Sequence, residues 1–144
     1  MLYKLSRRIK GDLDELITPK IKAFKEASFA KGTDGTLHGQ RSDSGGYKFL
    51  RVKVYGPLNV KTIKGCDVTF HTKSKNIEIS SDSKEFETSF SVELGIGITE
   101  FELFLDDSNM KELSQSMNKI TVKIKRKKYE FEVTNSNSFK KLMK

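Results

Sequence analysis

From Tyr47 onward, apolar and polar side chains alternate with a period of two residues, and this alternation limits the folds open to the chain. Successive side chains of a strand point to opposite faces, so the period predicts strands with one apolar and one polar face. Antiparallel sheets that cover a core with one face have this pattern. The segments that show it are 50–54, 58–64, 66–71, 77–79, 86–98, 101–105, 120–125 and 129–133.

These segments predict a mainly β (α+β) fold of about seven or eight antiparallel strands, arranged as a β-sandwich or a small barrel. The pattern does not choose between the two arrangements. The series over 86–98 is unusually long for one strand, and Gly95 and Gly97 predict a bend or a bulge in it.

The register of the last hairpin is predicted from its side chains. A turn centred on Arg126-Lys127 places Ile124 opposite Tyr129 and, on the other face, Lys123 opposite Glu130. Cross-strand pairs of opposite charge stabilise a sheet by a few tenths to about 1 kcal/mol. This register therefore pairs apolar side chains on one face of the hairpin and opposite charges on the other.

A chain of 144 residues is long enough for one domain with a real core, and we expect a single domain over 1–144. Apolar residues at steps of three and four predict a helical segment over 1–30, in which Thr18-Pro19 begins a second helix. Residues 31–46 hold five of the ten glycines and are expected to form a flexible Gly/Ser-rich loop. The β domain is expected over 47–134, followed by a short helical tail over 135–144.

A further short helix is predicted between two of the strands. Asn109 and Glu112 have the spacing of a capping box, and Met110, Leu113 and Met117 share one face of the helix that would follow.

The net charge of +8 is unevenly distributed. Residues 82–107 carry eight acidic side chains and one basic one, whereas residues 119–144 carry nine basic side chains and two acidic ones. A basic excess attracts nucleic acid or an anionic membrane surface. The alternative is that the acidic and basic segments pair with each other inside the fold.

Cysteine use and hydropathy indicate a cytoplasmic protein. Cys66 is the only cysteine, so no internal disulfide can form. No stretch approaches the roughly 20 apolar residues of a membrane-spanning helix, and the first residues do not form a secretory signal.

No catalytic constellation or cofactor motif is evident. Cys66 and His71 are an odd number of residues apart on one strand and so face opposite ways, and Cys66 is expected to be a small buried side chain. His38 is expected in the glycine-rich loop. Too few histidines and cysteines are present for a conventional zinc site, and the glycines fit neither a P-loop nor a dinucleotide motif. We therefore expect no enzyme activity, no cofactor and no metal.

The candidate binding residues are cations at the turn of the last hairpin and in the front helix. At the hairpin tip they would reach phosphates in solvent, although the register above turns the adjacent Tyr129 toward the core. Lysine also protects exposed strand edges, which is the alternative interpretation. The residues are Lys123, Lys125, Arg126, Lys127, Lys128, Arg7 and Arg8.

The sequence thus predicts a non-catalytic binding or assembly module, with a protein partner or self-association as its first expected mode. One alternative is nucleic-acid binding through the basic hairpin and the basic front helix. Another is attachment to an anionic membrane surface through the amphipathic helix over 2–16.

Overall fold

A computed structural model describes residues 28–143, and these residues form a mainly β structure with two short helices. Most of them belong to one sheet. Its strands are β1 (Ala30–Gly32), β2 (Gly35–Ser44), β3 (Tyr47–Gly56), β5 (Cys66–Thr72), β6 (Asn76–Ser80), β8 (Ser89–Ser91), β9 (Ile96–Leu105), β10 (Met117–Ile124) and β11 (Lys127–Val133).

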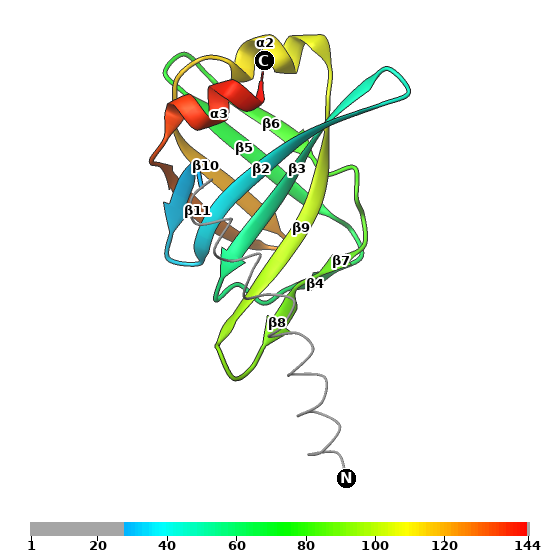
Figure 1. Ribbon diagram of the computed structural model, residues 1–144, viewed down its shortest axis with the longest axis vertical. Helices are drawn as coiled ribbons and strands as arrows, with labels where there is room; N and C mark the ends of the chain where they lie inside the picture. The colour runs from blue at the N-terminus through cyan, green and yellow to red at the C-terminus, as the bar shows by residue number, and fades with distance from the viewer. Residues whose placement is uncertain (1–27, 144) are drawn as a thin grey trace.

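This nine-stranded sheet of the described residues is antiparallel, in the order β6-β5-β10-β11-β1-β2-β3-β9-β8, and it curls strongly into a half-barrel (Figure 1). An isolated bridge between Ser81 and Leu103 brings the chain after β6 against β9. A smaller sheet pairs β4 (Lys61–Thr62) with β7 (Phe86–Glu87). The predicted mainly β, antiparallel class is confirmed.

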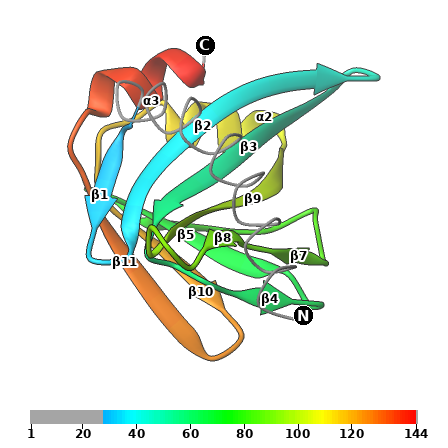
Figure 2. The ribbon, with the colours of Figure 1, turned by 60° about the horizontal axis from the view of Figure 1, so that its bottom comes forward.

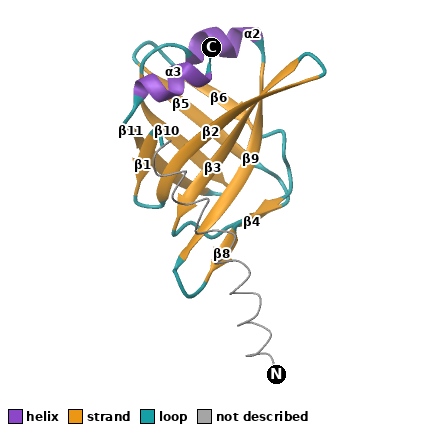
Figure 3. Cartoon of the chain, viewed as in Figure 1, coloured by secondary structure: helices purple, strands orange, loops and turns teal. Residues whose placement is uncertain are grey.

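The helices α2 (Asp107–Leu113) and α3 (Ser136–Leu142) lie together at one end of the half-barrel (Figure 3). Phe139 of α3 is buried there, with its ring 5.0 Å from Phe29 and 5.7 Å from Phe70 between centroids. The apolar members of the alternating series form the rest of the core, as Leu50, Val52 and Val54 do in β3. Alternation thus predicted which face of each strand is buried. We call the end with α2 and α3 the helical end.

The expectation of a flexible loop over 31–46 was wrong, because β1 and β2 occupy most of this segment. Gly45 and Gly46 form the turn between β2 and β3, but Gly39 serves close packing. A Cβ on Gly39 would come within 2.8 Å of Leu142 Cδ1 and 3.1 Å of Phe29 Cε1, so a larger residue here would force these side chains of the helical end to shift. A high glycine content is typical of loops, but it also occurs where a strand is closely approached by other groups. The β structure accordingly begins at Ala30 and not at Tyr47.

The last hairpin forms with a different register from the predicted one. Its turn is Lys125-Arg126, so Val122 pairs with Tyr129, Ile124 pairs with Lys127, and Lys123 faces Lys128. The two registers differ by two residues along the partner strand, which keeps every side chain on its face. Face alternation therefore could not distinguish them.

Two further boundaries differ from prediction. The chain over 86–98 is not one bent strand, because β8 ends at Ser91 and a turn closed by Gly95, at φ 66°, leads into β9. The predicted strand over 58–64 is reduced to β4.

The predicted short helix is present as α2, but it begins earlier than expected. Its N-cap is Asp106, whose Oδ1 accepts from the Asn109 backbone N–H at 2.7 Å. Asp106 and Asn109 have the same three-residue spacing as Asn109 and Glu112, and the earlier pair caps the helix because β9 ends at Leu105. The short helix predicted over 135–144 is confirmed by α3. The helix predicted over 1–30 lies almost wholly outside the described residues.

Candidate functional site

The predicted basic run forms the tip of the β10–β11 hairpin, which Figure 2 shows projecting away from α2 and α3. Lys123, Lys125, Arg126, Lys127 and Lys128 are all exposed. The turn requires Lys125 to adopt a positive φ of 60°, a conformation that glycine and asparagine tolerate better than lysine. The Lys127 ammonium lies 5.3 Å from the ring centroid of Tyr129, which itself is buried.

A second segment meets this tip. The turn after β4 brings Ile63 and Lys64 to the hairpin, and together with Thr62, Lys125 and Arg126 they line a hollow of about 470 Å³. Thr62 holds this turn from inside: its hydroxyl donates to the Gly65 carbonyl at 3.3 Å and accepts from the Lys64 backbone N–H at 3.2 Å. Ile63 is consequently displayed to solvent with 68% of its surface exposed.

We call the resulting cluster the basic end. It consists of Lys64, Lys123, Lys125, Arg126, Lys127 and Lys128. The name does not include Lys61, which lies in β4 and faces Glu87 in the β4–β7 register.

The acidic segment 82–107 does not neutralise the basic end. Among its carboxylates, Glu102 binds Arg51 of β3 at 2.7 Å and Glu100 binds Lys53 of β3 at 3.2 Å. Within residues 28–143, no cation of the basic end takes part in an ion pair. The nearest carboxylate in register is Asp67, which faces Lys123 across β5–β10 and accepts a hydrogen bond from Ser80 at 2.7 Å. The positive charge of the basic end is therefore largely uncompensated.

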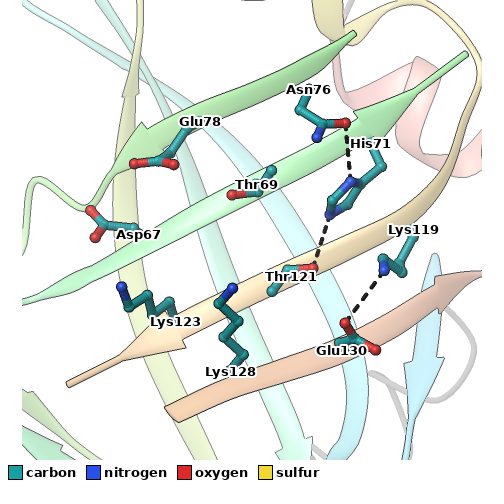
Figure 4. A pocket seen from close by; sticks show the side chains of 10 residues that line it. All are labelled: Asp67, Thr69, His71, Asn76, Glu78, Lys119, Thr121, Lys123, Lys128 and Glu130. Atoms are coloured by element: carbon teal, nitrogen blue, oxygen red, sulfur yellow. Dashed lines mark hydrogen bonds and ion pairs between the residues drawn. The ribbon is translucent and has the colours of Figure 1, made fainter. Parts of the chain in front are cut away.

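Next to the basic end, the outer face of the sheet holds a shallow polar hollow of about 500 Å³ (Figure 4). Lys123 and Lys128 enter it from neighbouring strands. Farther along, His71 Nε2 lies 2.9 Å from Thr121 Oγ1 and His71 Nδ1 lies 3.1 Å from Asn76 Oδ1. The hollow is lined by Asp67, Thr69, His71, Asn76, Glu78, Lys119, Thr121, Lys123, Lys128 and Glu130.

The Thr121–His71–Asn76 row joins a hydroxyl, an imidazole and an amide across three neighbouring strands. A hydroxyl beside an oriented imidazole is one component of nucleophilic catalysis. Here the row lies on the outer face of the sheet, and His71 of β5 joins its own strand to β6 through Asn76 and to β10 through Thr121. We interpret it as a cross-strand polar network that stabilises β5, β6 and β10.

The other reactive side chains are buried. Cys66 is 5% exposed, and burial raises the pKa of its thiol to about 12, so it is protonated at neutral pH. The prediction of a buried Cys66 is confirmed. His38 is not in a loop as expected: it lies in β2 at 2% exposure, with Nε2 2.7 Å from Thr36 Oγ1. Burial, together with the nearby Lys53, lowers the His38 pKa to about 4.

Aromatic side chains form a second exposed cluster, at the helical end of the outer face. Tyr47 and Phe49 each lie 5.8 Å from Phe104 between ring centroids. Tyr47 is 60% exposed and Phe104 is 40% exposed. We call these three residues the aromatic cluster.

Arg7 and Arg8, the remaining predicted site residues, lie outside the described residues. In the part of the chain that the structure describes, no three His, Cys, Asp or Glu side chains gather into a group that could hold a metal ion. No helix within that part is long and apolar enough to cross a membrane.

Sequence reasoning found the hairpin tip but missed its partner segment. Lys64 and Ile63 lie about sixty residues before Lys125, and no local pattern indicates that the two turns meet. The chain matches no protein family, no curated protein and no solved structure. Function is therefore inferred from the geometry of these residues.

Proposed function

We propose that the protein is a non-catalytic binding module and that its basic end holds an anionic partner. The observation that carries this proposal is the meeting of Lys64 with Lys125 and Arg126 around one hollow, where none of the three forms an ion pair with another described residue. Like charges brought together at a surface repel each other, and an anion placed among them removes that repulsion. Nucleic acids and anionic membranes both supply dense negative charge.

The backbone of the turn supports a binding role. Lys125 occupies a position where glycine or asparagine would be less strained, so the turn carries its cation at a cost in stability. Such a cost is typical of positions kept for a function.

Retention on immobilised heparin tests the proposal, because heparin is a generic polyanion. We expect the wild-type protein to be retained and to elute with salt, and a triple variant of the basic end to elute at clearly lower salt. In the variant Lys64→Gln/Lys125→Asn/Arg126→Gln, asparagine preserves the positive φ at position 125.

A matched control variant removes the same charge from exposed lysines at the helical end. The control is Lys73→Gln/Lys111→Gln/Lys141→Gln, and we expect it to elute close to the wild type. Equal losses in the two variants would mean that net charge alone determines retention, and the proposal would fail.

Self-association is a second candidate function, favoured by the aromatic cluster. Aromatic side chains are enriched at protein interfaces, and Tyr47 and Phe104 are exposed next to each other. We propose that this cluster joins two copies of the chain. Sedimentation velocity of the wild type and of Tyr47→Ser/Phe104→Ser tests it: the wild type should form a species larger than the monomer that the variant does not form.

A further inference from the structure

At the end of the half-barrel away from the helices, the turn after β4 combines Lys64 with an exposed aliphatic side chain, whereas the turn between β8 and β9 carries exposed aliphatic side chains on either side of Glu93. Ile63 is 68% exposed, Val92 is 76% exposed and Leu94 is 49% exposed. These three are all of the large aliphatic side chains that are exposed among residues 28–143. Ile63 lies in the turn after β4, and the other two lie in the turn between β8 and β9, which Figure 1 shows at the end away from α2 and α3.

From this combination we infer that the anionic partner is a lipid bilayer and that Ile63 enters it; the inference rests on the proposed function of the basic end. A phosphate-bearing surface satisfies Lys64, Lys125 and Arg126, and each cation near an anionic membrane adds to its attraction. Nucleic acid supplies the same phosphates but has no apolar layer for an aliphatic side chain. The acyl boundary beneath the lipid phosphates supplies that layer.

The hollow at the basic end offers both parts of such a surface a partner. Ile63 lines it together with Lys64 of its own turn and with Lys125 and Arg126 of the hairpin. The aliphatic stems of lysine and arginine extend the apolar surface around Ile63, while their charged heads reach the phosphate level. Because Thr62 holds the turn, Ile63 is presented without a conformational change.

The positions of the aromatic side chains also favour a lipid surface over nucleic acid. Proteins that bind single-stranded nucleic acid combine cations with exposed aromatic rings on which bases stack. Tyr129, the aromatic residue next to the basic run, is buried at 7% exposure. The exposed aromatic rings of the described residues, Tyr47 and Phe104, belong to the aromatic cluster at the helical end.

Co-sedimentation with vesicles tests the inference. We expect the full chain to sediment with phosphatidylcholine vesicles that contain phosphatidylserine and to stay in solution with phosphatidylcholine alone. Ile63→Ser keeps every charge of the basic end and should lower the partition onto anionic vesicles about tenfold, as expected from the loss of one largely buried aliphatic side chain. Ile63→Leu, which keeps an aliphatic side chain of the same volume at this position, should leave the partition unchanged.

A fluorescent label reports insertion directly. Cys66 is buried, so a thiol introduced by Ile63→Cys can be labelled selectively with an environment-sensitive dye. Anionic vesicles should raise the emission of a dye at position 63 and shift it to the blue. The same dye at Lys73→Cys, at the helical end, should not respond.

The outcomes separate this inference from the proposed function. Salt-dependent retention on heparin without vesicle binding would overturn the lipid inference and leave the anion-binding function standing; a gel shift with duplex DNA would then identify nucleic acid. Vesicle binding that Ile63→Ser does not weaken, or a dye at position 63 that does not respond, would also overturn the inference. If the wild-type protein neither binds heparin nor sediments with anionic vesicles, the proposed function itself is wrong.

Discussion

Lys123 lies directly opposite Lys128 in the β10–β11 ladder, so two ammonium groups share one cross-strand position on the outer face of the sheet. Like charges in this position destabilise a sheet. The shift of two residues from the predicted register creates this pair, because the predicted register placed Glu130 opposite Lys123. The like-charge pair therefore lies within the surface that we propose binds an anionic partner.

Lys128→Glu should separate stability from binding. The variant replaces a like-charge pair with an opposite-charge pair, and the free energy of unfolding should rise by about 0.5 to 1 kcal/mol. Retention on heparin should fall at the same time. Urea unfolding and heparin elution of one preparation measure both effects, and Lys73→Glu is the charge-matched control, expected to change neither strongly. A Lys128→Glu variant that is less stable than the wild type would contradict this account of the pair.

His38 should make the fold sensitive to acid. Its pKa is about 4 in the folded state and about 6.5 when exposed, so the unfolded chain binds the proton more tightly. The contribution of His38 to stability is therefore fully present above about pH 6.5 and is lost as the pH falls toward 4. Over this range the free energy of unfolding should fall by about 3 kcal/mol through His38 alone. Urea unfolding between pH 7 and pH 4 measures it.

The comparison with a His38→Gln variant isolates this contribution, because the carboxylates titrate in both proteins. The difference in unfolding free energy between wild type and variant should shrink or reverse as the pH falls. A difference that stays constant with pH would show that the pKa of His38 is the same in the folded and unfolded states.

Strand faces were predictable because alternation reports burial directly. Leu50, Val52 and Val54 are buried as expected, and so is Cys66 with its phase partners. Alternation does not report which residues pair across strands, since a shift of two residues keeps both faces intact. The β10–β11 register therefore had to come from the turn, where Lys125 adopts a positive φ that its identity does not predict.

Only half of the proposed binding surface was predictable, for a related reason. A run of cations at a hairpin turn is visible in the sequence, and it is where the structure places it. The turn that brings Ile63 and Lys64 beside it depends on the curl of the whole sheet, which no local pattern encodes. Glycine was ambiguous in the same way, because Gly39 serves tight packing that cannot be distinguished from loop flexibility without its neighbours.

Gly39→Ala should destabilise the helical end. The new methyl group would come too close to Leu142 Cδ1 and would press on Phe29 Cε1, so both side chains must shift, and overpacking of this kind costs about 1 to 3 kcal/mol. Urea unfolding measures the loss. Adding Leu142→Ala makes room for the methyl group, so the double variant should be more stable than the sum of the two single effects predicts. Simple additivity would mean that Gly39 and Leu142 do not contact each other.

Lys125→Gly tests whether the turn gives up stability for charge. Glycine adopts the φ of 60° without the close contact between Cβ and backbone that lysine has, which stabilises the folded chain. Glycine also gives the unfolded chain more freedom, which offsets part of this gain. We expect the free energy of unfolding to rise by about 0.5 to 1 kcal/mol. Heparin retention and partition onto anionic vesicles should both fall, because one cation of the basic end is gone. Lys125→Ala removes the same charge but keeps a Cβ, so it should lose binding to the same extent without the gain in stability. Equal stability of the two variants would show that the backbone at position 125 is not strained. The proposal that this turn binds an anionic partner would then depend on its charge alone.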